Sequence, residues 1–195
     1  MDNEPKEIEL KLRIDPQDIA ALRNHPRFAM VLPEPIRETL NSIYFDTDNR
    51  FLYKHGLTLR VSQIGERRIQ TVKTATSAFL ERSEWEQAIE SDQPDLARWR
   101  ESALGPLLTY DVRNALQPIF ETRINRRSYG LNENGTEILL AIDEGQIIAT
   151  GSYCPICEIE LELKRGNPRE LFKIAREIVS SVPAQLDVKS KPERG

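Results

Sequence analysis

Residues 7–11 read Glu7-Ile8-Glu9-Leu10-Lys11 and alternate charged with apolar side chains. Because successive side chains of a β-strand point to opposite faces, a strand here has one charged face and one apolar face. Near the other end of the chain, residues 158–164 read Glu-Ile-Glu-Leu-Glu-Leu-Lys and repeat the design. Like charges gathered on one sheet face repel one another. The two stretches together therefore favour a cation bound among their carboxylates over an ordinary solvated sheet face.

The composition indicates one soluble domain with a hydrophobic core. The chain has 195 residues, of which 39% are hydrophobic and 30% are charged, and its net charge is -4. This length suits a single domain, and the acidic balance argues against a general nucleic-acid binder or a membrane-surface binder. The sequence has no run of 18 apolar residues and begins without a basic or apolar leader pattern, so we predict a cytoplasmic protein.

The two cysteines, Cys154 and Cys157, form a single Cys-x-x-Cys pair. Such a pair occurs in redox motifs and in half of a zinc site, but a structural zinc ion needs four ligands. The two histidines, His25 and His55, lie far from the cysteines in sequence and in stretches of different character. We therefore expect the cysteines to be incidental residues that lead into a strand.

The rest of the chain alternates β patterns with turn signals, and helical patterns are few. We predict strands over 7–12, 37–46, 57–64, 67–76, 81–90, 119–131, 137–148 and 158–165, helices over 15–25, 92–103, 105–116 and 169–179, a loop over 27–36, and an unstructured polar end over 187–195. About eight strands in mostly antiparallel order predict an α+β protein with an eight-stranded antiparallel β-barrel, or tunnel, and flanking helices. The charged strand faces would line the inside of this barrel.

The charged faces fall into two chemical groups. The carboxylates are Glu7, Glu9, Asp143, Glu158 and Glu160, and the cations are Lys11, Arg60, Lys73, Arg82 and Arg126. Carboxylate oxygens suit Mg²⁺ or Mn²⁺, which are typically held by a few carboxylates together with water and substrate phosphates. Arginine forks match phosphate oxygens, and lysine binds them as a point charge. A lumen with both groups predicts a divalent ion and a chain of phosphates as its ligands.

The same residues carry a family resemblance. Glu7-Ile8-Glu9-Leu10-Lys11 resembles the ExExK signature of the CYTH, or triphosphate tunnel metalloenzyme, family. Six further stretches resemble that family in order: Tyr44-Phe45-Asp46-Thr47, Arg60 after Gly56-Leu57, Gln70-Thr71-Val72-Lys73, Arg82-Ser83-Glu84-Trp85-Glu86, Ala141-Ile142-Asp143 and Glu158-Ile159-Glu160-Leu161-Glu162. ExExK alone is a weak signal, but the resemblance extends over nearly the whole chain.

The resemblance implies a tunnel that binds triphosphate groups with Mg²⁺ or Mn²⁺. The metal ligands would be Glu7, Glu9, Glu158 and Glu160, with Asp143 beside them and Glu162 as a further candidate. The phosphate ligands would be Lys11, Arg60, Lys73, Arg82 and Arg126. Lys191 would close one tunnel mouth, and Glu84 would be a partner of these cations. Lys11 or a carboxylate such as Glu160 would orient the attacking water. Arg126 is chosen over Arg123 and Arg127 by its spacing to Tyr129.

The activity that the resemblance implies is metal-dependent hydrolysis of triphosphate substrates, with inorganic tripolyphosphate first among them. Adenylyl cyclase, thiamine triphosphatase and a non-catalytic polyphosphate-binding module stay open as alternatives, and we can place no aromatic residue at the tunnel mouth to favour an organic triphosphate. A lipocalin-like carrier is disfavoured because the conspicuous alternate strand faces are charged.

Two further features of the sequence bear on the resemblance. Many family members carry Arg-x-Arg on the third strand, whereas here Arg60 is followed by Ser62, which removes a cation for the terminal phosphate. Residues 1–189 are predicted as the CYTH domain. Residues 190–195 resemble the junction that in many bacterial members leads to a C-terminal helical CHAD domain, so the chain would be a truncated part of a longer protein.

Overall fold

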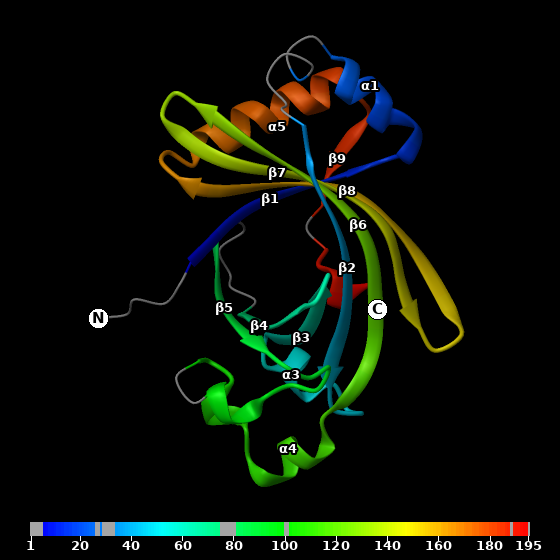
Figure 1. The fold of residues 1–195 in the computed structure, drawn as a ribbon, viewed down its shortest axis with the longest axis vertical. Helices are drawn as coiled ribbons and strands as arrows, with labels where there is room; N and C mark the ends of the chain where they lie inside the picture. Colours follow the sequence, from blue (N-terminus) through cyan, green and yellow to red (C-terminus); the bar gives the residue numbers. More distant parts are fainter. Residues whose placement is uncertain are drawn as a thin grey trace.

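β1 (Lys6–Ile14) is the strand at which the sheet closes on itself (Figure 1). The computed structural model describes residues 6–25, 28, 34–74, 81–99, 102–187 and 189–194. β1 pairs antiparallel with β8 (Ser152–Arg165), and its first residues also pair with β5 (Glu81–Ile89). The remaining strands of the ring are β2 (Ile36–Asp46), β3 (Leu57–Ile64), β4 (Arg67–Thr74), β6 (Gln117–Glu133) and β7 (Thr136–Ala149).

The ring runs β1-β8-β7-β6-β2-β3-β4-β5 and returns to β1, with every neighbouring pair antiparallel. The predicted α+β class with an eight-stranded antiparallel barrel and flanking helices is therefore confirmed. A ninth strand in the described part of the chain, β9 (Ala184–Leu186), lies against the end of β1 and was not expected.

The outer face of β1, β6, β7 and β8 is apolar because every second residue of these strands is apolar. α1 (Ile19–Asn24), preceded by η1 (Pro16–Asp18), and α5 (Arg169–Ser181) cover this face (Figure 1). Leu12, Leu140 and Leu161 belong to the same buried cluster as Leu171 and Ile178 of α5. Their burial holds the strands in a register that directs the alternate, charged residues inward.

A second apolar cluster covers the outside of β3 and β4. Leu59 and Val72 pack with Trp99 and Leu104, which come from the connection between β5 and β6. This connection contains η2 (Leu96–Trp99), η3 (Gly105–Leu107) and α4 (Tyr110–Ala115). The two clusters lie outside the barrel, so neither fills its lumen.

The prediction of a helix over 92–103 was wrong for the described residues of this range, whose only helical element is the short turn η2. Asp95 accounts for part of the difference, because its backbone N–H donates to Gln70 Oε1 and its carbonyl oxygen accepts from Gln70 Nε2. These bonds to β4 compete with helical backbone pairing. The segment 105–116 is likewise divided into η3 and α4. Most of the loop predicted over 27–36 lies outside the described residues, as do residues 75 and 76 of a predicted strand.

The prediction of an unstructured end over 187–195 was also wrong for the described residues. After β9, the short turn η4 (Lys191–Glu193) enters the curve of the sheet (Figure 1, red). Ser190 forms a capping box with Glu193 at the start of η4, and the Asp187 N–H donates to the Lys11 carbonyl oxygen at 2.8 Å. The segment is therefore tied to β1 and placed in the barrel.

The two cysteines lie on opposite sides of β8. Cys154 packs against the cluster of Tyr44 and Phe120, whereas Cys157 packs against the cluster under α5. Both are free thiols, and this arrangement excludes a disulfide between them. Burial, with Glu144 and Asp15 adding to it, raises the pKa of Cys157 to about 11. In the described part of the chain, no helix combines the length and the apolar character that crossing a membrane requires.

Candidate functional site

The inward faces of the strands surround a cavity of about 850 Å³. Its wall carries both charged groups that the sequence indicated, including Glu9 and Lys11 from β1, Arg60 from β3, Arg126 from β6 and Glu160 from β8. The alternation of each strand explains this placement, since the residues between these charges point outward into the apolar clusters. The barrel thus gathers residues from distant parts of the chain in one enclosed, charged space.

Three carboxylates form a deeply buried acidic group beside the cavity, and one of them, Glu160, lines its wall. Asp143 lies opposite Glu158 in the β7–β8 register, and Glu160 follows two residues later on the same face of β8. Asp143 and Glu158 are fully buried and Glu160 is nearly so. One oxygen from each lies within 4.8 Å of the other two. We call these three residues the carboxylate cluster.

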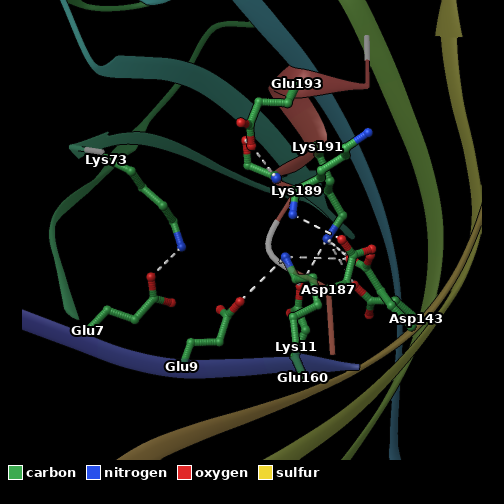
Figure 2. A network of polar contacts seen from close by, with 12 residues as sticks. Glu7, Glu9, Lys11, Lys73, Asp143, Glu160, Asp187, Lys189, Lys191 and Glu193 are labelled. Carbon is green, nitrogen blue, oxygen red and sulfur yellow. Dashed lines mark hydrogen bonds and ion pairs between the residues drawn. The ribbon is translucent and has the colours of Figure 1, made fainter. Parts of the chain in front are cut away.

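The ammonium group of Lys191 lies among these carboxylates (Figure 2). Its Nζ is 2.6 Å from Glu158 Oε1, 3.0 Å from Glu160 Oε1 and 3.3 Å from Asp143 Oδ2. Lys191 is itself buried, although it comes from the C-terminal turn η4 rather than from a barrel strand. Burial by itself would lower the pKa of Lys191, but Glu160, Glu158 and Asp143 hold that pKa well above its ordinary value.

Two further cations contact the carboxylate cluster. Lys11 Nζ lies 3.1 Å from Glu160 Oε1, and Arg126 donates to both oxygens of Asp143 and also to Glu160. Burial alone would raise the pKa of Glu160, but Lys191, Arg126 and Lys11 hold it well below its ordinary range. Glu160 is therefore ionised at neutral pH, in a closely packed network of opposite charges.

The carboxylates of β1 lie on the same cavity wall but outside the carboxylate cluster. Glu7 accepts a hydrogen bond of 2.7 Å from Lys73 Nζ, and Glu9 Oε1 lies 3.4 Å from Lys11 Nζ (Figure 2). Lys73 also lies 3.1 Å from Glu84, the expected partner of the cations. The five predicted metal ligands thus fall into a group of three on β7 and β8 and a pair on β1.

Arg60 has hydrogen-bonding capacity that the described residues do not use. Its Nε is buried without a hydrogen-bond partner there, and its Nη2 lies 3.8 Å from Glu84 Oε1. Ser62, at the position where the resemblance implied a second arginine, shares a 2.8 Å hydrogen bond with Ser42 in the wall. Arg82 also lines the cavity. An anion in the cavity would satisfy the buried donor of Arg60.

The carboxylate cluster fits a divalent metal by its donor set. It offers carboxylate oxygens alone, which suit Mg²⁺ or Mn²⁺, and Glu160 borders a cavity with room for water and substrate. No histidine or thiolate belongs to this group of residues. The donor set therefore does not favour zinc.

Comparison with known families gives the identity of this barrel. The CYTH domain model matches residues 5–194, nearly the whole chain. The chain belongs to the CYTH family. An inorganic triphosphatase from Haemophilus influenzae is 34% identical over 198 residues, which cover 97% of this chain and 54% of that protein. This CYTH chain thus spans about half the length of its curated relative.

Solved structures share the CYTH fold. A Hippeastrum protein, described as an adenylyl cyclase candidate with a dominant triphosphatase activity, superposes with a TM-score of 0.69 at 18% identity over 95% of this chain and 92% of that one. The PH1819 protein of Pyrococcus horikoshii gives a TM-score of 0.62 at 20% identity over 96% of this chain and 97% of that one. At these identities the likeness shows the barrel fold alone.

In the CYTH barrel, residues that the sequence analysis missed also contact the carboxylate cluster or line the cavity. Arg194 donates to Glu158 Oε2 at 3.1 Å and binds Asp187, so a second cation of the C-terminal segment reaches the cluster. Tyr53, half-exposed, lines the cavity and lies under the guanidinium of Arg50, 5.0 Å from its ring centroid. For Arg194, the one signal in the sequence was the Ser190-x-x-Glu193 spacing of a capping box, which indicates an ordered turn before it.

Proposed function

We propose that this CYTH chain hydrolyses triphosphate substrates in a metal-dependent reaction and that inorganic tripolyphosphate is its preferred substrate. The observation that carries the proposal is one cavity that is lined by Arg60, Lys73, Arg82 and Arg126 and bordered by the carboxylate cluster through Glu160. A site for tripolyphosphate needs both cationic side chains and carboxylates. Arginine and lysine bind the phosphate oxygens, and carboxylates bind the metal that accompanies the substrate. The triphosphatase activity of the Haemophilus influenzae relative supports the same substrate class.

Mg²⁺ or Mn²⁺ would be held by Asp143, Glu158 and Glu160, with Glu7 and Glu9 facing it from β1. When bound there, the ion neutralises charge that develops during in-line displacement at phosphorus. The protein residues supply the positioning. Arg60, Lys73, Arg82 and Arg126 would bind the phosphate oxygens from one side of the cavity. The buried, unpaired Nε of Arg60 is a preformed donor for one of them.

Lys11 would act as a charged donor rather than as a base. Burial and Lys191 act to lower the pKa of Lys11, but Glu160, Glu9 and Glu158 raise it above its ordinary value. Lys11 is therefore protonated at neutral pH and can hold the attacking water or a phosphate oxygen. Glu160 has its pKa held down by three cations, so it would accept a hydrogen bond from the water without removing its proton.

An organic triphosphate is a second candidate because of Tyr53. The sequence let us place no aromatic residue at the mouth of the barrel, whereas the structure places the half-exposed Tyr53 ring on the cavity wall beside Lys54. Such a ring can stack on a base or a thiazole ring. Tyr53→Ala should reduce hydrolysis of ATP or thiamine triphosphate without affecting tripolyphosphate if the organic group binds here.

Phosphate release from tripolyphosphate, ATP and thiamine triphosphate, measured with Mg²⁺, with Mn²⁺ and with chelator, tests the proposal. We expect rapid release from tripolyphosphate that needs a metal and is lost in Arg60→Met, while the outward and exposed Arg123→Met serves as the matched control. Conversion of ATP to cyclic AMP would instead identify a cyclase. Binding of all three without turnover would identify a polyphosphate-binding module and overturn the enzymatic proposal.

The CHAD domain after residue 195 and the role of 190–195 as a linker stay predictions. The length of the Haemophilus influenzae relative, of which this chain covers 54%, supports a longer protein. In the described structure, Ser190, Lys191 and Glu193 lie against the cavity. A linker in this position would connect a following domain directly to the candidate site.

A further inference from the structure

The C-terminal segment, residues 189–194, supplies a cation at the place where the proposed metal would bind. Lys191 Nζ lies within 3.3 Å of an oxygen from each member of the carboxylate cluster (Figure 2). A divalent ion bound by the same oxygens would require the space and the charge that the ammonium group now provides. The two cations therefore exclude one another at this position.

The charges around the carboxylate cluster also favour mutual exclusion of the Lys191 ammonium group and a divalent metal. Asp143, Glu158 and Glu160 together carry three negative charges, and four positive groups contact them, those of Lys191, Lys11, Arg126 and Arg194. A buried group of this kind tolerates a dication poorly while all of these protein cations are in place. Lys11 and Arg126 lie on barrel strands, whereas Lys191 belongs to a segment that follows the last strand.

The contacts of this segment are few and polar. Besides Lys191, Arg194 bonds to Glu158 at 3.1 Å and to Asp187, the Lys189 N–H donates to Asp187 Oδ1 at 2.9 Å, and Arg50 donates to the Pro192 carbonyl oxygen. Ser190 and Glu193 bond to each other within the segment. The preceding strand β9 pairs with β1 and would stay in place. Among the described residues, the contacts of Lys191 and Arg194 with the carboxylate cluster are the ones that a metal would replace, and the bonds to Asp187 keep the segment attached at its start.

We propose that Lys191 is a tethered cation that holds the carboxylate cluster together in the metal-free protein, and that a divalent metal binds by displacing it and releasing residues 189–194 from the cluster. This inference rests on the proposed function, because it takes the cluster as the metal site. Once displaced, the ammonium group is free to contact a phosphate of the substrate. Metal entry and opening of the C-terminal segment are then one event.

Calorimetric titration of chelator-treated full chain with Mn²⁺, in the absence of substrate, tests the inference. Lys191→Met removes the competing charge and should bind Mn²⁺ more tightly than the unaltered protein, within the range of roughly 5- to 150-fold that coupled sites show. Lys189→Met is the matched control, because Lys189 is exposed and its side chain makes no ion pair in the described residues. Its affinity should stay within about twofold of the unaltered protein.

Hydrogen exchange on the unaltered protein gives a second test that does not depend on the folding of a variant. Saturating Mn²⁺ should speed amide exchange in residues 189–194 and leave β9 unchanged. Equal Mn²⁺ affinities of Lys191→Met and the unaltered protein, or unchanged exchange at saturation, would overturn the inference while leaving the metal site intact. Absence of Mn²⁺ binding in every variant would instead overturn the metal site of the proposed function, and this inference with it.

Discussion

Arg126 and Asp143 face each other across β6 and β7 and are joined by two hydrogen bonds of 2.7 Å, from Nε to Oδ1 and from Nη2 to Oδ2. This forked geometry is available to arginine and not to lysine. Arg126→Lys should therefore lower the free energy of unfolding by about 1.5–3 kcal/mol, the range for hydrogen bonds to charged groups. Urea unfolding at neutral pH measures the change. Arg123→Lys, on the exposed face of the same strand, is the control, and an equal loss in both variants would contradict the assignment.

The charge network predicts a dependence of stability on pH. Burial alone would raise the pKa of Glu160, but Lys191, Arg126 and Lys11 hold it well below the ordinary value of 4.5. The contribution of ionised Glu160 is therefore complete above pH 4.5 and is lost as the pH falls through the lower folded-state pKa. The difference in unfolding free energy between the unaltered protein and Glu160→Gln should shrink below pH 4.5. A difference that stays constant from pH 7 to strongly acidic pH would disprove this.

Gly145 lies where β7 approaches β6 too closely for a side chain. A Cβ at this position would lie 2.0 Å from the Arg123 carbonyl oxygen and 2.9 Å from Ile124 Cα, both of which are backbone atoms. Gly145→Ala should therefore destabilise the barrel by about 1–3 kcal/mol, the cost of overpacking. Gly130→Ala on β6 is the matched control, since its Cβ would meet nothing within 4 Å. Thermal unfolding of the two variants should separate them clearly, and similar melting temperatures would refute the argument.

The thiol of Cys157 should react slowly. Burial, with Glu144 and Asp15, raises its pKa from 9.0 to about 11. Folding therefore favours the thiol form over the thiolate. The contribution of Cys157 to the free energy of unfolding is complete below pH 9 and is lost as the pH rises toward 11. With Cys154→Ser leaving one thiol, alkylation of folded protein at pH 8 should be about a hundredfold slower than in denaturant, following the thiolate fraction. Rates that agree in the two states would show that the thiol is not perturbed.

Much of the barrel could be predicted because strand alternation is a local property. The alternation of side chains along five consecutive residues puts Glu7, Glu9 and Lys11 on one face of a strand. In the structure all three line the cavity. Arg126 was chosen over its neighbours by its spacing to Tyr129, and the alternation of β6 gives the physical reason for its position. Arg126 points inward to Asp143 and Glu160, whereas Arg123 is exposed and Arg127 pairs with Glu144 outside.

The residues that were missed depend on contacts between distant segments. Lys191 was named from the family resemblance alone, and Arg194 was missed. Nothing near either residue in sequence shows that Asp143 and Glu158 will lie beside it, so a polar end looked unstructured. Tyr53 reaches the cavity wall because the buried carboxylate of Asp46 accepts hydrogen bonds from the N–H groups of Leu52 and Tyr53, which fixes the turn of α3 (Phe51–Lys54). Asp46 was recognised as part of a motif, but the sequence alone did not show which residues it would orient.

The closure of the barrel at β1 has a consequence for how the protein is made. Leu10 pairs with Leu161 and Lys11 with Glu160, so β1 finds its β8 partner only after the six strands between them have been synthesised. Pairing between such distant segments is slow, and a half-synthesised chain exposes unpaired strand edges that invite aggregation. The nascent barrel therefore passes through a stage in which these strand edges are unprotected. Its acidic and basic residues first enclose a common space only when translation has reached β8.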